Sequence, residues 1–170
     1  MRGLLKDVEK DGIVRWEDVA ASKGCPSSLR AEKGPVAVIE CLQEIPCNPC
    51  ETGCSFGAIS VGDPITNLPV LDEEKCKGCG RCVAVCPGLA IFIEDLSEPG
   101  NEARVTLAYE YLPLPERGAA VRATDRAGQE ICDAKVVDVK KPAAFNKTAV
   151  ITISVPKDYV HEARGIASLG

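Results

Sequence analysis

The chain has 170 residues, of which 45% are hydrophobic and 4% aromatic, and its formal net charge is −5. This length fits one or two compact domains with a hydrophobic core. The negative charge argues against a nucleic-acid binder, which needs Lys and Arg side chains to neutralise phosphates. No apolar run approaches the roughly 18–20 residues of a membrane-spanning helix, so we expect no membrane span.

Residues 1–34 are predicted to form a helical extension. The pattern of residues 14–22 favours a helix with its apolar side chains toward one side, and Gly and Pro in the stretch 22–28 end it. Trp16, inside this helix, is expected to pack in the core. The first ten residues lack the apolar run of a secretion signal, so we expect no signal peptide.

Residues 35–95 are predicted to form a domain in which short strands surround cysteine motifs. Residues 35–39 are apolar and β-branched, which favours a strand that leads into Cys41. Three more segments have a similar character: 57–61, 70–71 and 89–93. We expect the two segments that follow the cysteine motifs, 57–61 and 89–93, to pair with 36–39 and 70–71.

The run from Cys76 to Pro87 carries the most specific motif of the chain. It reads C-x2-C-x2-C-x3-C-P, the spacing with which bacterial ferredoxins bind a [4Fe–4S] cluster. Its cysteines are Cys76, Cys79, Cys82 and Cys86. Gly78 and Gly80 relieve the backbone crowding of a chain that curls around so small a group. In two-cluster ferredoxins the last cysteine of this run binds the other cluster, so the run predicts a second ligand set.

The second set lies upstream and is irregular. A shift of 32 residues places Cys47, Cys50 and Cys54 on Cys79, Cys82 and Cys86, which indicates an internal repeat. The same shift places Cys76 on Glu44, so the nearest candidate for the missing ligand is Cys41. The first motif then reads C-x5-C-x2-C-x3-C, with residues 42–46 as a longer loop.

Pairing across the repeat predicts two ligand sets. One [4Fe–4S] cluster is expected to be bound by Cys76, Cys79, Cys82 and Cys54. The other is expected to be bound by Cys41, Cys47, Cys50 and Cys86. For the irregular position two alternatives stay open, namely Cys25 as the ligand or a three-iron cluster without a fourth thiolate. Ile and Val side chains of the short strands are expected to cover both clusters and to tune their reduction potentials.

Other interpretations of the cysteines fit less well. Structural zinc sites use C-x2-C pairs separated by a longer gap, and disulfide frameworks belong to small secreted chains. Free thiolates for cluster assembly imply a reducing compartment, so we expect a cytoplasmic location. Cys25 and Cys132 lie outside the repeat and are predicted to be small, buried, unreactive thiols. His161, the single histidine, lies in a charged stretch and is expected to be solvated or to support a neighbour.

The last part of the chain changes to a β pattern. Residues 96–102 are predicted to be a linker, and residues 103–170 a β-rich docking domain with a C-terminal helix. Strands are expected over 105–111, 118–123, 131–139 and 149–155, with a tight turn at 125–128. Pro156 is expected to end the last strand and to open a helix over 157–164. Strands at this spacing favour a small sheet or barrel.

The predicted fold class is therefore α+β. It consists of a pseudo-twofold two-[4Fe–4S] ferredoxin domain, an N-terminal helical extension and a C-terminal small β-sheet or barrel domain. Residues 41–94 resemble bacterial two-[4Fe–4S] ferredoxin domains. More narrowly, residues 39–51 and 78–92 resemble the small iron–sulfur subunits that accompany FAD-dependent amine and imino-acid dehydrogenases, which act on proline, hydroxyproline, sarcosine and related compounds.

This resemblance implies an electron-transfer subunit that is not an enzyme on its own. The FAD would be bound by partner dehydrogenase subunits, and a small [2Fe–2S] subunit is a further partner that the family suggests. Single electrons would pass from the flavoprotein through the two clusters to another redox centre or carrier. The main alternative is a free, diffusible ferredoxin with an appended β domain. A catalytic role is a third hypothesis, but four thiolates per cluster leave no open iron for a substrate.

Overall fold

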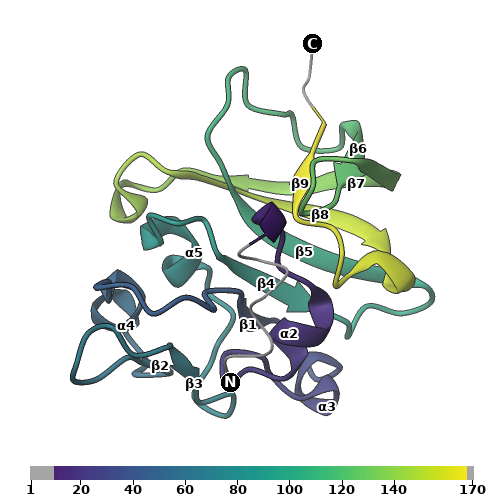
Figure 1. Cartoon of the computed structure of the whole chain (residues 1–170). Helices are drawn as coiled ribbons and strands as arrows, with labels where there is room; N and C mark the ends of the chain where they lie inside the picture. The colour runs from purple at the N-terminus through teal and green to yellow at the C-terminus, as the bar shows by residue number, and fades with distance from the viewer. Residues whose placement is uncertain (1–9, 168–170) are drawn as a thin grey trace.

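A computed structural model describes residues 10–167 of the chain (Figure 1). The expectation that there is no signal peptide rests on the first ten residues. Of these, only Lys10 lies within the described part of the chain. The ends of the predicted helical extension and of the β-rich domain, residues 1–9 and 168–170, lie outside that part as well. Within residues 10–167, no helix has the length and apolar character needed to cross a membrane.

The main element is a seven-stranded sheet with the strand order β1-β4-β5-β8-β7-β6-β9. Its strands are β1 Val36–Ile39, β4 Ile91–Asp95, β5 Glu102–Tyr109, β6 Ala120–Thr124, β7 Glu130–Lys140, β8 Ala149–Pro156 and β9 Gly165–Ile166. All neighbouring pairs in it are antiparallel. A separate two-stranded sheet consists of β2 Ile59–Ser60 and β3 Val70–Leu71.

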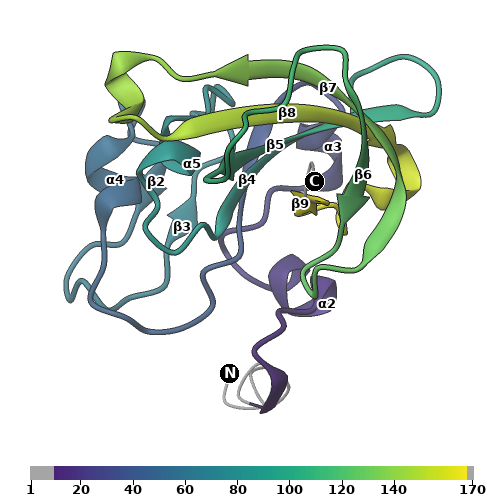
Figure 2. The ribbon, with the colours of Figure 1, turned by 90° about the horizontal axis from the view of Figure 1, so that it is seen from above.

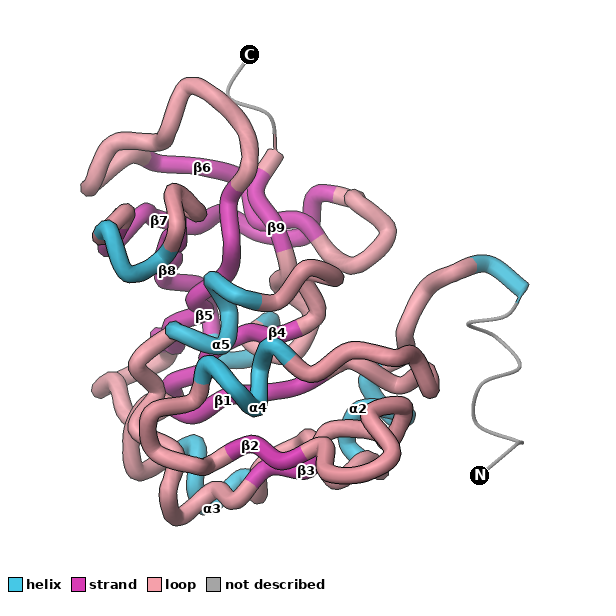
Figure 3. Tube along the Cα trace, turned by 90° about the vertical axis from the view of Figure 1, so that its left-hand side faces the viewer, coloured by secondary structure: helices cyan, strands magenta, loops and turns pink. Residues whose placement is uncertain are grey.

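The helices are short. Those that lie wholly within the described residues are α2 Trp16–Ala20, α3 Ser28–Ala31, α4 Pro49–Gly53 and α5 Arg81–Val85, together with the 3₁₀ turns η1 Ala143–Phe145 and η2 Lys157–Tyr159. Figures 1 and 3 show α4 and α5 side by side near the β2–β3 pair, and they are in contact. In Figure 2 this end of the molecule lies opposite β6 and β9. The structure is thus a mixture of helices and strands dominated by antiparallel pairing, as the predicted α+β class requires.

The expected pairing of the short strands is confirmed. β1 pairs with β4, with Ile39 opposite Ile91, and β2 pairs with β3, with Ile59 opposite Leu71. Each strand after a cysteine motif therefore pairs with a strand that precedes one. The pseudo-twofold arrangement of the whole domain stays a prediction.

The β1–β4 pair is buried on both of its faces. Opposite residues in an antiparallel pair point to the same side, and successive residues alternate. Ile39 and Ile91 therefore share one face, while Val38 and Phe92 share the other. Ile39, Ile91 and Val38 are at most 2% exposed, so neither face of the pair is open to solvent.

The segment predicted to be a linker connects two neighbouring strands. β4 pairs with β5, with Glu94 opposite Val105, so one sheet continues from the cysteine-rich part into the β-rich tail. The tail nevertheless has a core of its own, which includes Val105, Ile151 and Val136. The domain boundaries stay a prediction, but the two parts share a sheet.

The strands of the tail follow the predicted alternation with one correction. In β5 the side chains from Ala103 to Tyr109 are buried at every second position. The strand ends at Tyr109, however, and Tyr111 is 73% exposed, so the alternation does not extend to it. Among residues 10–167 β1 and β9 form the two edges of the sheet, so the tail is an open sheet and not a closed barrel.

The helix expected over residues 157–164 does not form. Only η2, Lys157–Tyr159, is helical, and the chain then turns toward β6. The backbone N–H of Arg164 donates to the carbonyl of Thr124 at 2.8 Å, and β9 pairs with β6. Backbone pairing with a distant strand has overridden the local helical preference.

Candidate metal centres

The eight motif cysteines gather around two apolar cavities. The lining of the first includes Cys41, Cys47, Cys50 and Cys86. The lining of the second includes Cys54, Cys76, Cys79 and Cys82. The structure thus brings together the members of each predicted ligand set, including the two cysteines that cross from one motif to the other set. That these sets bind clusters stays a prediction.

Aliphatic side chains cover both cavities. Ile39 and Ile91, which are paired across β1 and β4, line the first cavity together with Ile45 of the longer loop. Ile93 of β4 and Ile59 of β2 line the second. The strands therefore supply the apolar cover that the sequence predicts. Such a cover keeps water from a bound cluster and influences its reduction potential.

The backbone around the last cysteine of each motif repeats in detail. The N–H of Ala58 donates to Cys54 Sγ at 3.3 Å, and the N–H of Ala90 donates to Cys86 Sγ at 3.4 Å. These pairs are 32 residues apart, as are α4 and α5. N–H donors stabilise negative charge on cluster-bound sulfur and are one of the factors that set the potential.

Cys76 is held from two directions by the N-terminal part of the chain. The N–H of Ala37 in β1 donates to Cys76 Sγ at 3.4 Å. Arg30 of α3 donates to the carbonyl of Cys76 at 2.7 Å and to the carbonyl of Glu73 at 2.9 Å. The predicted helical extension therefore contributes to the position of a candidate ligand, a role that the sequence analysis did not assign to it.

Gly78 is required by close packing as well as by its backbone conformation. Its φ of +59° lies in the left-handed region, and a Cβ atom there would meet the carbonyl oxygen of Pro35 at 2.5 Å. Gly80, with φ +79°, has open space where a Cβ would point. Both glycines thus permit the tight curl that the motif predicts, but only Gly78 is also restricted by a neighbour.

Cys41 and Cys25 lie on opposite sides of β1. Cys41 follows the strand and lines the first cavity. Cys25 packs against a small core formed by Val19, Val38 and Leu42 and does not appear in the lining of either cavity. Cys41 therefore lies with the other three cysteines of its predicted set, and Cys25 does not. The backbone N–H of Cys47, at the end of the longer loop, is anchored by the carbonyl of Ile65 at 3.2 Å.

The metal-free thiols have raised pKa values where they are buried. Loss of hydration, followed by the nearby Cys76 and Cys79 thiols, raises the pKa of Cys82 to about 12. Burial, followed by the neighbouring Cys86, raises the pKa of Cys50 to about 11, and the pKa of Cys41 rises for the same reasons. Because metals bind thiolates, these cysteines must release protons when a cluster is assembled.

These shifts predict that the metal-free chain loses stability in alkali. The folded state holds the Cys82 proton more tightly than the unfolded chain, whose thiol titrates near 9.0. This contribution to stability is fully present below the unfolded value and is lost as the pH rises toward the folded value. We expect the urea midpoint of the chelated chain to fall between about pH 8 and about pH 10.5, and to fall less in Cys82→Ala. An equal decrease in both proteins would contradict this account.

The remaining singled-out residues lie away from both cavities. Cys132 is buried in the core of the tail, as predicted, and burial raises its pKa. Cys25 is half-buried, and its pKa is raised to about 11, again mainly by burial. Trp16 packs at the edge of the small N-terminal core, as expected. His161 is more constrained than predicted, because its ring stacks on Trp16 with 3.8 Å between centroids.

The cavities differ from a site for one metal ion. Among residues 10–167, no three His, Cys, Asp or Glu side chains are close enough together to bind a single ion. A tetrahedral zinc site needs each sulfur at about 2.3 Å from the same atom. In a [4Fe–4S] cluster each cysteine binds a different iron, so the sulfur atoms do not have to converge on one point.

Comparison with known proteins identifies the second motif. The family model Fer4, a 4Fe-4S binding domain, matches residues 69–92. One component of the ion-translocating oxidoreductase complex of Methanosarcina acetivorans is 47% identical over 47 residues, which are 28% of this chain and 17% of that protein. The polyferredoxin-like subunit of the aliphatic sulfonate oxidoreductase of Pyrococcus furiosus is 48% identical over 48 residues, 28% of this chain and 27% of that protein. The ferredoxin-type protein NapF of Escherichia coli is 32% identical over 88 residues, 45% of this chain and 54% of that protein.

These similarities cover parts of the proteins compared. The chain spans from 17% to 54% of the length of these three relatives, and no solved structure matches it significantly. The matched segment 69–92 contains all four cysteines of the second motif. The chain therefore contains a 4Fe-4S binding domain, which indicates a [4Fe–4S] cluster, and its relatives are ferredoxin-like proteins and oxidoreductase subunits.

Proposed function

We propose that this protein is an electron-transfer subunit that carries two [4Fe–4S] clusters. The observation that carries the proposal is the presence of two apolar cavities, each lined by four cysteines, in one fold. Cys54, Cys76, Cys79 and Cys82 would hold one cluster, and Cys41, Cys47, Cys50 and Cys86 the other. Each bound cluster would supply a one-electron redox couple.

The residues around the cavities fit this role. Thiolates are the ligands that iron–sulfur clusters require, and each cavity offers a full set of four. The backbone N–H groups of Ala37, Ala58 and Ala90 point at the sulfurs of candidate ligands. With every iron bound to a cysteine, no coordination position is left for a substrate. The chain on its own is therefore expected to bind and insulate clusters, not to catalyse a reaction.

The proposed electron donor is an FAD-dependent dehydrogenase subunit. This part of the proposal rests on the resemblance of residues 39–51 and 78–92 to the small iron–sulfur subunits of amine and imino-acid dehydrogenases. The names of the curated relatives, which include subunits of oxidoreductase complexes, support assembly with larger partners. FAD would be bound by those partners, a small [2Fe–2S] subunit could complete the complex, and the free thiols favour the reducing cytoplasm.

A pulldown from native cytosol separates this proposal from a free ferredoxin. The tagged chain would be purified anaerobically, and iron, sulfide and flavin would be measured in the eluate. We expect about eight irons per chain, together with FAD and larger subunits in fixed ratio. About eight irons on a lone chain without flavin would instead indicate a diffusible ferredoxin with an appended β domain.

The irregular ligand can be tested by iron content. Cys41→Ala is expected to lose about four irons, or about one if a three-iron cluster remains. Cys25→Ala serves as the matched control, because Cys25 is also a half-buried cysteine near β1 and should retain all iron. Full iron content in Cys41→Ala would show that Cys41 is not the ligand, and iron loss in Cys25→Ala would support Cys25 as the alternative ligand.

A further inference from the structure

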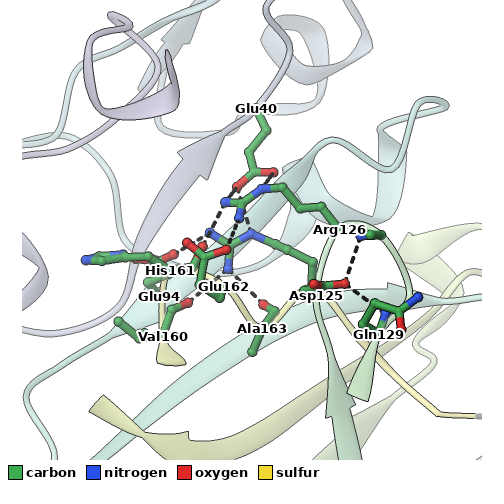
Figure 4. A network of polar contacts seen from close by, with 11 residues as sticks. Glu40, Glu94, Asp125, Arg126, Gln129, Val160, His161, Glu162 and Ala163 are labelled. Carbon is green, nitrogen blue, oxygen red and sulfur yellow. Dashed lines mark hydrogen bonds and ion pairs between the residues drawn. The ribbon is translucent and has the colours of Figure 1, made fainter. Parts of the chain in front are cut away.

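Figure 4 shows a network of polar contacts that includes Glu40, Glu94 and Arg126, and several of its charged side chains are buried. Glu40, the residue directly before Cys41, is 7% exposed, and Glu94 of β4 is 1% exposed. By strand alternation both carboxylates point to the face of the β1–β4 pair that is opposite to Ile39 and Ile91, which line the first cavity. The network is thus separated from a candidate ligand by a single peptide unit.

Two arginines from the β-rich tail hold Glu40. Arg126, in the turn between β6 and β7, donates to both carboxylate oxygens, with Nη2 at 2.7 Å and Nε at 3.0 Å. Arg164, just before β9, donates from Nε to the same carboxylate at 2.7 Å. These partners are 86 and 124 residues away in the sequence, so contacts from the β-rich tail reach the start of the ligand loop.

The arginines are themselves fixed. The Arg164 side chain is 3% exposed, donates from Nη2 to Glu94 at 2.7 Å and lies 4.6 Å from the centroid of the Phe92 ring. Arg126 also donates to Glu162 at 2.9 Å and to the carbonyl of His161 at 2.7 Å. Each guanidinium therefore joins Glu40 to at least one other element, and neither can move without breaking several bonds.

The buried polar atoms of this network are all hydrogen-bonded. Among residues 10–167, every buried side-chain nitrogen and oxygen atom has a hydrogen-bond partner. The Nδ1 atom of His161 lies 2.8 Å from Glu94, and the His161 ring covers Trp16 of α2. A fully satisfied network of this kind favours one arrangement of the groups that it joins.

We propose that Arg126 and Arg164 are positioning residues for Cys41. The two-point contact of Arg126 and the single bond of Arg164 fix Glu40, and with it the backbone where the irregular ligand loop begins. Their charges compensate the carboxylate of the residue that directly precedes Cys41. The tail thereby controls both the retention and the reduction potential of the cluster held by the Cys41 set. The inference rests on the proposed function, because it requires a cluster in that cavity.

The test compares Arg126→Gln and Arg164→Gln with Arg122→Gln. Arg122 is a matched control, since it also bonds two carboxylates but lies at the surface of β6. We expect Arg164→Gln to fall from about eight to about four irons per chain and the control to keep all of them. In Arg126→Gln, which leaves the Arg164 contact in place, one of the two reduction potentials is expected to fall, because an excess negative charge disfavours the reduced cluster.

Glu40→Gln provides the opposite change of charge. It removes one negative charge from the network and leaves both arginines in place, so the same potential is expected to rise instead of fall. Arg164→Lys keeps the positive charge but cannot bond Glu40 and Glu94 with the geometry of a guanidinium. Compared with Arg164→Gln, it should restore the reduction potential more fully than the iron content. The signal that Cys41→Ala removes identifies which potential belongs to the first cavity. A purely structural role would not reverse the sign of the shift between Arg126→Gln and Glu40→Gln.

Three results would overturn the proposal. The first is unchanged iron and unchanged potentials in the arginine variants, and the second is an equal loss of both clusters. The third is unfolding of all variants, Arg126→Gln and Arg164→Lys included, as seen by circular dichroism, because the network would then serve the fold alone. If the unmodified chain itself does not carry about eight irons, the proposed function fails first, and the two failures are distinguishable.

Discussion

Cys54→Ala combined with Cys79→Ala is expected to lose no more iron than Cys79→Ala alone, whereas Cys54→Ala combined with Cys50→Ala should lose all of it. Cys54 and Cys79 line the same cavity, although they come from different motifs. Cys50 and Cys54 come from the same motif but line different cavities. Changes within one site should therefore not be additive, while changes in separate sites should add.

The measurement is iron and sulfide per chain after anaerobic purification. The expected values are about four irons for the first pair and close to none for the second. Cys132→Ala is the control, since this cysteine is buried in the tail core and should leave the iron content unchanged. If Cys54→Ala combined with Cys50→Ala lost only about four irons, the two cysteines would belong to one cluster. The assignment of the last cysteine of each motif to the other cluster would then be wrong.

Gly78→Ala is expected to destabilise the protein by about 2–5 kcal/mol, the sum of the left-handed backbone cost and the overpacking cost. The added Cβ would meet the Pro35 carbonyl oxygen at 2.5 Å, and this backbone atom cannot rotate away. The strain falls between Cys76 and Cys79, so iron should be lost together with stability. Anaerobic urea unfolding and iron analysis measure the two effects.

Gly80→Ala is the matched control for this effect. Its φ of +79° is also left-handed, but nothing lies within 4 Å of the added Cβ. It should therefore cost about 1–2 kcal/mol, the backbone contribution alone. Equal effects of the two substitutions would show that the contact with Pro35 does not matter and that only the backbone conformation does.

The cysteine-rich part could be predicted because its constraints are local and repeated. A cluster motif requires a fixed spacing of its cysteines. Three cysteines of the first motif lie 32 residues before three cysteines of the second, so the same spacing recurs in the first half of the domain. The pairing of β1 with β4 followed from the same repeat, since each short apolar strand flanks a motif. Local patterns also located β5, β7 and β8, in which buried and exposed side chains alternate along much of the strand.

The contacts between distant parts of the chain could not be predicted. Glu40 meets Arg164 across 124 residues, and nothing in either local sequence indicates its partner. The helix expected after Pro156 was wrong because β9 pairs with β6, a long-range effect that local propensity does not contain. His161 was expected to be solvated or to support a neighbour, and the sequence could not name that neighbour, since its contacts with Trp16 and Glu94 join segments that are far apart in the chain.

Iron and acid-labile sulfide content, measured together with electron paramagnetic resonance of the reduced chain, tests the central claim most directly. Two clusters predict about eight irons and about eight sulfides per chain. They also predict a reduced spectrum that changes shape between half and full reduction, because two neighbouring spins interact. About four irons with one simple signal would contradict the two-cluster account, and would mean that the first cavity, with Cys41 and its longer loop, does not hold a cluster.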